Sequence, residues 1–187
     1  MKAFVAPILA LLLLAGCNRG SQLMPLESGN TWTYDCTAGL VNRVATVRVS
    51  RPAPVGQTSG WALVSEMGTT TLAWQDGRLI AGQLGNSEFF PPLPIFSDQK
   101  PGTVSKWAGR VRTAGHTVPA TATLKVSSSE ESVDGKKTVL PTGQVELTAV
   151  GVIHEIDTWF RLGKGIHLQE HRVGGQLVSR MRYVSGP

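Results

Sequence analysis

The sequence has 187 residues, of which 41% are hydrophobic and only 17% are charged, and it contains 21 glycines and 11 prolines. This length predicts a single domain, and a composition rich in turn formers favours strands over helices. The net charge of +5 is too small to predict nucleic-acid binding, which needs a concentrated basic patch with stacking aromatic side chains.

The start of the chain has the layout of a secretory signal peptide. Lys2 gives a positive beginning, residues 3–14 form an apolar run too short to cross a membrane as a helix, and Leu14-Ala15-Gly16-Cys17 follows. This tetrapeptide resembles the lipobox of bacterial lipoproteins. The resemblance implies removal of residues 1–16, acylation of Cys17 and anchoring to a membrane of the cell envelope. An ordinary signal peptide with a chance cysteine at its end is the alternative.

The residues after the lipobox predict how the domain is attached. Residues 17–27 are expected to be the lipidated cysteine and a short polar tether, and residues 28–187 a single β domain. In many Gram-negative lipoproteins an Asp after the cysteine favours retention in the inner membrane. Asn18 stands there instead, which resembles the outer-membrane class wherever that rule applies. The membrane is the first expected partner, and an envelope protein or an anionic polymer the second.

Alternating apolar and polar residues predict strands along the domain, and no sustained helical period follows Cys17. In the first strand, alternation places Trp32, Tyr34 and Cys36 on one face. Because Cys17 would carry lipid, Cys36 is expected to be a free, buried thiol. The further strands are expected at residues 40–50, 61–66, 69–75, 107–114, 117–127, 137–140, 144–150, 152–161, 166–173 and 176–184.

Asp76-Gly77 is a strong signal for a type I′ hairpin turn, and a turn there places Trp74 opposite Leu79. The segment 89–96 is different because it combines apolar residues with three prolines, which exclude a central strand. We expect a linking loop whose apolar side chains plug a core or cap one end of a barrel. An exposed binding ridge is the alternative.

The C-terminal segment predicts a closing hairpin about Gly174-Gly175. A two-residue turn there pairs Leu168 with Met181 on the apolar face, and a slip of one residue would invert both faces. The other face would gather a candidate basic patch that could bind anionic head groups or an acidic partner; an ordinary solvated sheet face is the alternative. The patch consists of His167, His171, Arg180 and Arg182.

These patterns predict an all-β antiparallel meander that forms a sandwich, a barrel or a half-barrel. The turn Pro141-Thr142-Gly143 and the later run Trp159-Phe160 to Gly163-Lys164-Gly165 resemble turns in a group of uncharacterised bacterial envelope proteins. That resemblance spans most of the mature chain. It implies a β-rich fold, and it implies no catalytic residue.

No recognisable catalytic chemistry is found. The sequence lacks a Gly-x-Ser-x-Gly motif, a phosphate-binding loop, a zinc cysteine pair and a dinucleotide fingerprint. His167 and His171 would lie about 13 Å apart along a strand, too far to share one metal ion. We therefore predict no catalytic residue, metal or cofactor, and a membrane-anchored, non-catalytic binding or scaffold domain. The alternatives are a half-barrel carrier of lipid or lipoprotein, and a hydrolase without a recognisable motif.

Overall fold

The computed structural model describes residues 22–187; the predicted signal peptide and Cys17 lie outside this range. Within it the elements are twelve strands. No helix of these residues has the length and apolar character needed to cross a bilayer. The strands are β1 (Thr31–Ala38), β2 (Val41–Val55), β3 (Thr58–Ser65), β4 (Gly68–Gln75), β5 (Arg78–Leu84), β6 (Ser87–Ser97), β7 (Val104–Thr113), β8 (His116–Val133), β9 (Lys136–Ala149), β10 (Val152–Arg161), β11 (Gly165–Val173) and β12 (Gln176–Ser185).

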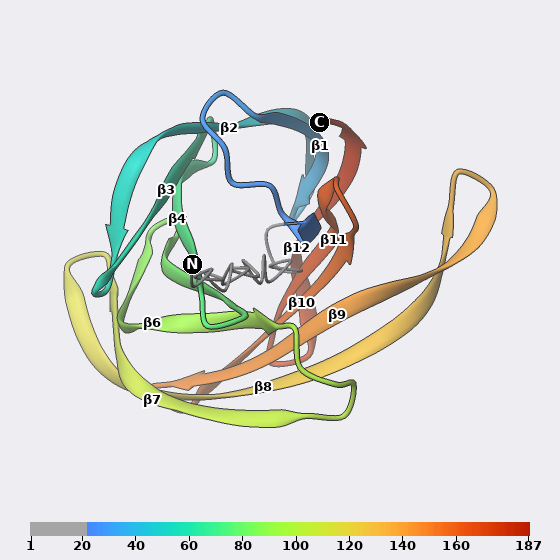
Figure 1. Cartoon of the computed structure of the whole chain (residues 1–187). Coiled ribbons are helices and arrows are strands. Elements are labelled where there is room, and N and C mark those ends of the chain that lie inside the picture. Colours follow the sequence, from blue (N-terminus) through green and yellow to red (C-terminus); the bar gives the residue numbers. More distant parts are fainter. Residues whose placement is uncertain (1–21) are drawn as a thin grey trace, which may run out of the picture.

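The strands form one closed antiparallel barrel. Each strand pairs with its neighbours in the sequence, and β1 closes the ring by pairing with β12. Figure 1 shows the strands following one another around this ring. The predicted all-β meander is confirmed, and of the three architectures left open it is the barrel.

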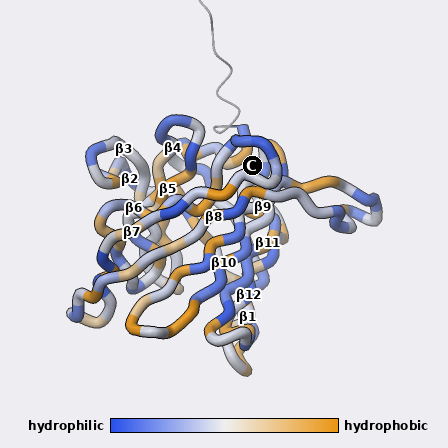
Figure 2. The backbone as a smooth tube through the Cα atoms, turned by 90° about the horizontal axis from the view of Figure 1, so that it is seen from below, coloured by the Kyte–Doolittle hydropathy of each residue, from blue (hydrophilic) through white to orange (hydrophobic). Residues whose placement is uncertain are grey.

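The two ends of the barrel differ. Residues 22–30, the C-terminus and the long β8–β9 hairpin lie at one end, called here the plugged end. The turns β1–β2, β3–β4, β5–β6, β7–β8, β9–β10 and β11–β12 lie at the other, called the open end. Figure 2 shows the C-terminus and the projecting β8–β9 hairpin on the same side of the molecule.

The N-terminal segment of the described chain seals the plugged end. Leu23 and Met24 are buried in the core. The amide of Gly163 donates to the carbonyl of Gln22 at 2.6 Å, and the indole Nε1 of Trp74 donates to the carbonyl of Met24 at 3.2 Å. The sequence predicts a polar tether here, but these residues pack as a plug, because the apolar side chains of Leu23 and Met24 are removed from water inside the barrel.

Local predictions from turns and alternation are confirmed. Trp74 pairs with Leu79 across the Asp76-Gly77 turn, and both turn residues have positive φ. Cys36 is a free thiol that is 4% exposed, and burial raises its pKa. The thiol therefore stays protonated and behaves as a small apolar group.

The prediction that the segment 89–96 is a loop is wrong. It lies within β6, which pairs with β5 along most of its length but with β7 only from Ser87 to Phe90. Beyond Phe90 one edge of β6 is free of ladder partners, so its prolines remove few hydrogen bonds. The expected plugging role is confirmed: Leu93, Ile95 and Phe96 are buried.

A glycine allows β6 to cross the inside of the barrel. This glycine, Gly143, lies in the middle of β9, which runs through Pro141-Thr142-Gly143 without the predicted break. A Cβ atom on Gly143 would lie 2.2 Å from the backbone oxygen of Ile95 in β6, so a larger residue would not fit there. In Figure 1, β6 crosses the ring on the inner side of β8 and β9.

The predicted register of the C-terminal hairpin is wrong by one residue. The turn at Gly174-Gly175 forms, but a bulge at Val178 follows it, so His171 pairs with Ser179 and Gln169 with Met181. The carbonyl of Val178 accepts a hydrogen bond of 3.2 Å from the amide of Gly39 in the β1–β2 turn. This contact comes from a distant part of the chain. Relative to the prediction the shift puts His171 inside the barrel and Glu170 outside it, whereas Ile166 stays inside.

Candidate binding cavity in the barrel lumen

The open half of the barrel contains a cavity of about 590 Å³, called here the lumenal cavity. Its volume lies within the range of small-molecule pockets in proteins. Its lining is mostly apolar and comes from all twelve strands. The apolar side chains include Met24, Val47, Leu63, Met67, Leu72, Leu84, Val111, Val118, Leu147, Ile156, Ile166 and Met181.

The distribution of large and small residues explains why one half is filled and the other is hollow. Trp32, Phe96 and Phe160 are fully buried core side chains, and Phe96 also packs edge-on against Trp74. Towards the open end the lining includes short residues such as Gly68, Gly85, Thr70, Ser87 and Ala149. A barrel of this size needs large side chains to fill its lumen, so short residues leave space there.

Two histidines form the main polar feature of the lumenal cavity. His154 Nδ1 and His171 Nε2 lie 3.1 Å apart, and the two rings are stacked at an interplanar angle of 20°. Each is two residues from the open-end terminus of its strand. Deeper in the lining, Gln169 Nε2 donates to Thr158 Oγ1 at 3.0 Å.

The lumenal cavity carries no permanent charge. Among the described residues that line it, none is Asp, Glu, Lys or Arg. Burial lowers the pKa of His171, and the neighbouring His154 lowers it further. Burial also raises the pKa of Tyr34, with a further contribution from Tyr183, so its phenol stays neutral. The site therefore suits an apolar molecule.

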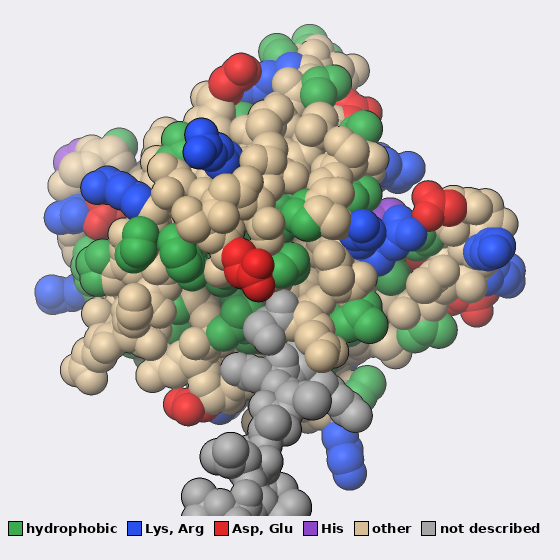
Figure 3. Space-filling view, turned by 45° about the horizontal axis from the view of Figure 1, so that its top comes forward, with side chains coloured by type: hydrophobic (Ala, Val, Ile, Leu, Met, Phe, Trp, Pro, Cys, Tyr) green, Lys and Arg blue, Asp and Glu red, His purple; other side chains and the backbone are tan. Residues whose placement is uncertain are grey.

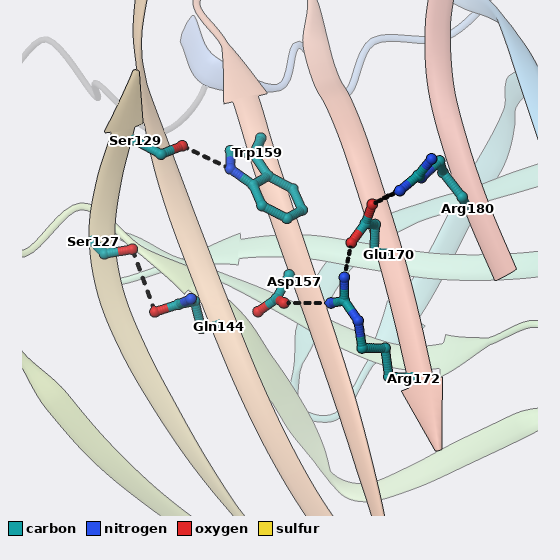
Figure 4. Close-up of polar contacts among 8 residues, drawn as sticks. All are labelled: Ser127, Ser129, Gln144, Asp157, Trp159, Glu170, Arg172 and Arg180. Atoms are coloured by element: carbon teal, nitrogen blue, oxygen red, sulfur yellow. Dashed lines mark hydrogen bonds and ion pairs between the residues drawn. The ribbon is translucent and has the colours of Figure 1, made fainter. Parts of the chain in front are cut away.

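The structure does not bring the predicted basic patch together. His171 lines the lumen, whereas Arg180 lies on the outer wall, where its Nε donates to Glu170 Oε1 at 2.8 Å. Arg172 also binds Glu170, and its Nη1 lies 3.1 Å from Asp157 Oδ2. Figure 4 shows this cluster across β10, β11 and β12. The charge of Arg180 is therefore paired.

The other two residues of the predicted patch are on the outside. Arg182 is exposed, and His167 is half-buried, with a buried Nδ1 that has no hydrogen-bond partner. Burial, Arg161 and Arg182 all lower the pKa of His167, so it adds little positive charge near neutral pH. On the face drawn in Figure 3, lysine and arginine side chains are spread out and do not form one patch.

A serine lines the lumenal cavity beside the histidine pair. Ser179 pairs with His171 and lines the lumen, but the imidazole of His171 bonds to His154, and no Ser–His hydrogen bond is formed within residues 22–187. In the same range no group of three or more His, Cys, Asp or Glu side chains is placed to hold a metal ion. What the site offers is an apolar space with a titratable rim.

A second hollow, of about 770 Å³, lies outside the barrel between the end of β2 and residues 88–92 of β6. It is more open to solvent than the lumenal cavity. The charged residues at its border are Arg51 and Glu88, and the carboxylate of Glu88 is already paired with Arg112. Because this hollow is on the outside and more open to solvent, we place the candidate site in the lumenal cavity.

Sequence reasoning missed the lumenal cavity. His154 and His171 are 17 residues apart, and they meet because β10 and β11 pair with Ile156 opposite His171. Alternation alone places His154 and Ile156 on one face. The sequence contains only a weak signal for the cavity: one apolar strand face, that of residues 152–161, carries a histidine near its end.

Three solved structures are similar to this chain at low sequence identity. A protein described as a lipoprotein of Parabacteroides distasonis matches with a TM-score of 0.51 and 9% identity, over 87% of this chain and 96% of that chain. A protein of Bacteroides fragilis described as exported and as having a YmcC-like fold has a TM-score of 0.47 and 9% identity, over 86% of this chain and 96% of that chain. The hypothetical lipoprotein YmcC of Escherichia coli has a TM-score of 0.46 and 13% identity, over 89% and 88%.

No protein-family model and no curated protein matches this sequence. The likeness to the Parabacteroides protein, which covers most of both chains, shows a shared fold. The chain thus has the all-β fold of a protein described as a lipoprotein.

Proposed function

We propose that this protein is a lipid-anchored, non-catalytic binding protein of the cell envelope, and that it binds an apolar molecule in the lumenal cavity. The observation that supports the proposal is the cavity itself, which is mostly apolar, has no Asp, Glu, Lys or Arg in its described lining, and is sealed at one end and open at the other. Burying each methylene group of a ligand there contributes about 0.8 kcal/mol. The carrier alternative would use the same site, in a closed barrel instead of a half-barrel.

The envelope location has two sources of support. Leu14-Ala15-Gly16-Cys17 resembles a lipobox, and proteins with similar structures are described as lipoproteins or exported proteins. Sorting to the outer membrane remains the prediction that Asn18 suggests, wherever Asp after the lipidated cysteine causes retention in the inner membrane.

Exchanging Asn18 for Asp should then move the protein to the inner-membrane fraction.

The anchor would orient the barrel. Gln22 is bonded to Gly163 at the plugged end and is five residues from Cys17 in the sequence. Five extended residues span at most about 18 Å. An acylated Cys17 would therefore hold the plugged end towards the membrane and the open end away from it. A ligand would enter from the side that faces away from the membrane.

Cys17→Ser should abolish anchoring. The serine hydroxyl cannot replace the thiol in acylation, so the variant should appear in the soluble fraction and should not incorporate labelled palmitate. Cys36→Ser is the matched control, because this buried cysteine has no part in anchoring. A wild-type protein that fractionates as soluble and takes up no label would contradict the lipoprotein reading.

Filling the lumenal cavity should block binding. Ile156 lines it, so Ile156→Trp should lower the affinity for a fluorescent alkyl probe by about tenfold or more, through lost space. Ile153→Trp is the control, because Ile153 is on the same strand and 42% exposed. Binding is measured on the chain from residue 17 with Cys17→Ser. Equal affinities for the two variants would place the ligand elsewhere.

A further inference from the structure

The position of the histidine pair gives the lumenal cavity an amphipathic lining. His154 and His171 lie near the open-end termini of β10 and β11, which are adjacent in the barrel (Figure 1). Deeper along the same strands the lining contains Ile156 and Ile166. A molecule with one polar end and an apolar chain would match this order, with the polar end at the rim.

The proton count of the pair decides which polar end it binds best. In the neutral pair one ring donates across the 3.1 Å contact, so the two nitrogens outside the contact are one donor and one acceptor. One added proton converts that acceptor into a second donor and leaves the contact intact. The singly protonated pair therefore presents two N–H donors and one positive charge, which suits an acidic head group.

We propose that the lumenal cavity takes an anionic amphiphile, with its alkyl chain among the apolar side chains and its acidic head group on His154 and His171. This inference rests on the proposed function and specifies its ligand class. Carboxylate, sulfonate and phosphate head groups share the chemistry that the pair recognises.

No carboxylate of the described lining competes with a bound anion for the two imidazoles. From β9, Leu147 pairs with His154, and from β12, Ser179 pairs with His171. The residues between them on β10 and β11, Glu155 and Arg172, pair with each other on the outer wall. Within the described lining no carboxylate faces the imidazoles.

The sign of the pH dependence follows from proton uptake. In the free protein burial and the neighbouring ring hold the pKa of His171 below its ordinary value. A bound anion favours the charged form and raises that pKa, so binding takes up a proton. Affinity for an anionic ligand should therefore rise as the pH falls through the histidine range, and affinity for a neutral ligand should not.

The test compares decanesulfonate, which stays ionised throughout, with decanol, which has the same alkyl chain and no charge. Calorimetric titration of the chain from residue 17, carrying Cys17→Ser, is carried out at about pH 5 and about pH 8, on either side of the ordinary histidine pKa. Decanesulfonate should bind about tenfold tighter at the lower pH, the scale of a charge-assisted hydrogen bond. Decanol should bind equally at both.

The double variant His154→Gln, His171→Gln should remove the pH dependence for decanesulfonate, because it leaves no imidazole at the rim to take up a proton. Its circular dichroism spectrum and melting temperature show whether it is folded. His116→Gln, at an exposed position on β8, is the matched control and should keep the dependence. If both ligands bind with no effect of pH, or if the double variant keeps the effect, the head-group inference is overturned and the proposed function stands. If neither ligand binds, the proposed function falls with it.

Discussion

Glu170→Gln is expected to lower the free energy of unfolding by about 2 kcal/mol. The side chain of Glu170 is only 7% exposed, and its carboxylate binds Arg172 and Arg180 together. A glutamine has nearly the same shape but no charge, so Arg180 would lose its anionic partner and Arg172 would keep only Asp157. The side chains of Arg172 and Arg180 are 30% and 42% exposed, which keeps the loss below that of a fully buried pair.

Glu130→Gln is the control for this substitution. Its carboxylate pairs with Lys137 on the β8–β9 hairpin, but both side chains are more than half exposed, at 52% and 86%. Such a surface pair contributes about 0–1 kcal/mol. Urea unfolding of the two variants compares them directly. If Glu170→Gln costs no more than Glu130→Gln, the outer-wall cluster does not stabilise the barrel.

Gly143→Ala is expected to cost about 3 kcal/mol, at the upper end of the range for overpacking. The added methyl group would lie 2.2 Å from the carbonyl oxygen of Ile95. That atom belongs to the backbone of β6, so relief requires moving a whole strand. For a domain of this size the melting temperature should fall by about 6–12 °C.

Gly82→Ala provides the graded comparison. There the nearest atom is Thr71 Oγ1 at 2.9 Å, on a side chain that is able to rotate, and the next is a methyl carbon of Val55 at 3.4 Å. The melting temperature of this variant should fall much less. Similar losses in both variants, measured by calorimetry, would mean that the Gly143–Ile95 approach does not limit packing.

The sequence predicts those parts of the fold that depend on neighbouring residues. Asp76-Gly77 fixes its hairpin because both residues tolerate the positive φ that the turn requires, and the pairing of Trp74 with Leu79 follows. The burial of Cys36 follows from alternation with Trp32 and Tyr34 in the same way. Each of these predictions needs only a few consecutive residues.

The candidate site depends on contacts that no local pattern contains. The bulge at Val178 receives a hydrogen bond from Gly39, across most of the chain. This one extra residue turns His171 into the lumen and leaves Glu170 with Arg180 on the outer wall. The strand within the proline-rich segment likewise depends on β7 leaving it after Phe90. Predicting either feature would require the tertiary structure first.

The pairing of β1 with β12 has a consequence for how the chain reaches this structure. The two strands are the first and the last of the barrel, so closing the ring joins segments that are separated by nearly the whole described chain. Contacts of such long range slow folding, because the entropy of the intervening chain is lost before they form.

The ten residues of β12 pair with both β1 and β11. Until they are available, β1 and β11 each have an unpaired sheet edge. Such an edge is a template for pairing with other chains. Synthesis proceeds from the N-terminus, so every nascent chain passes through a stage with two such edges. The chain is therefore most prone to aggregation just before its last strand emerges and closes the ring.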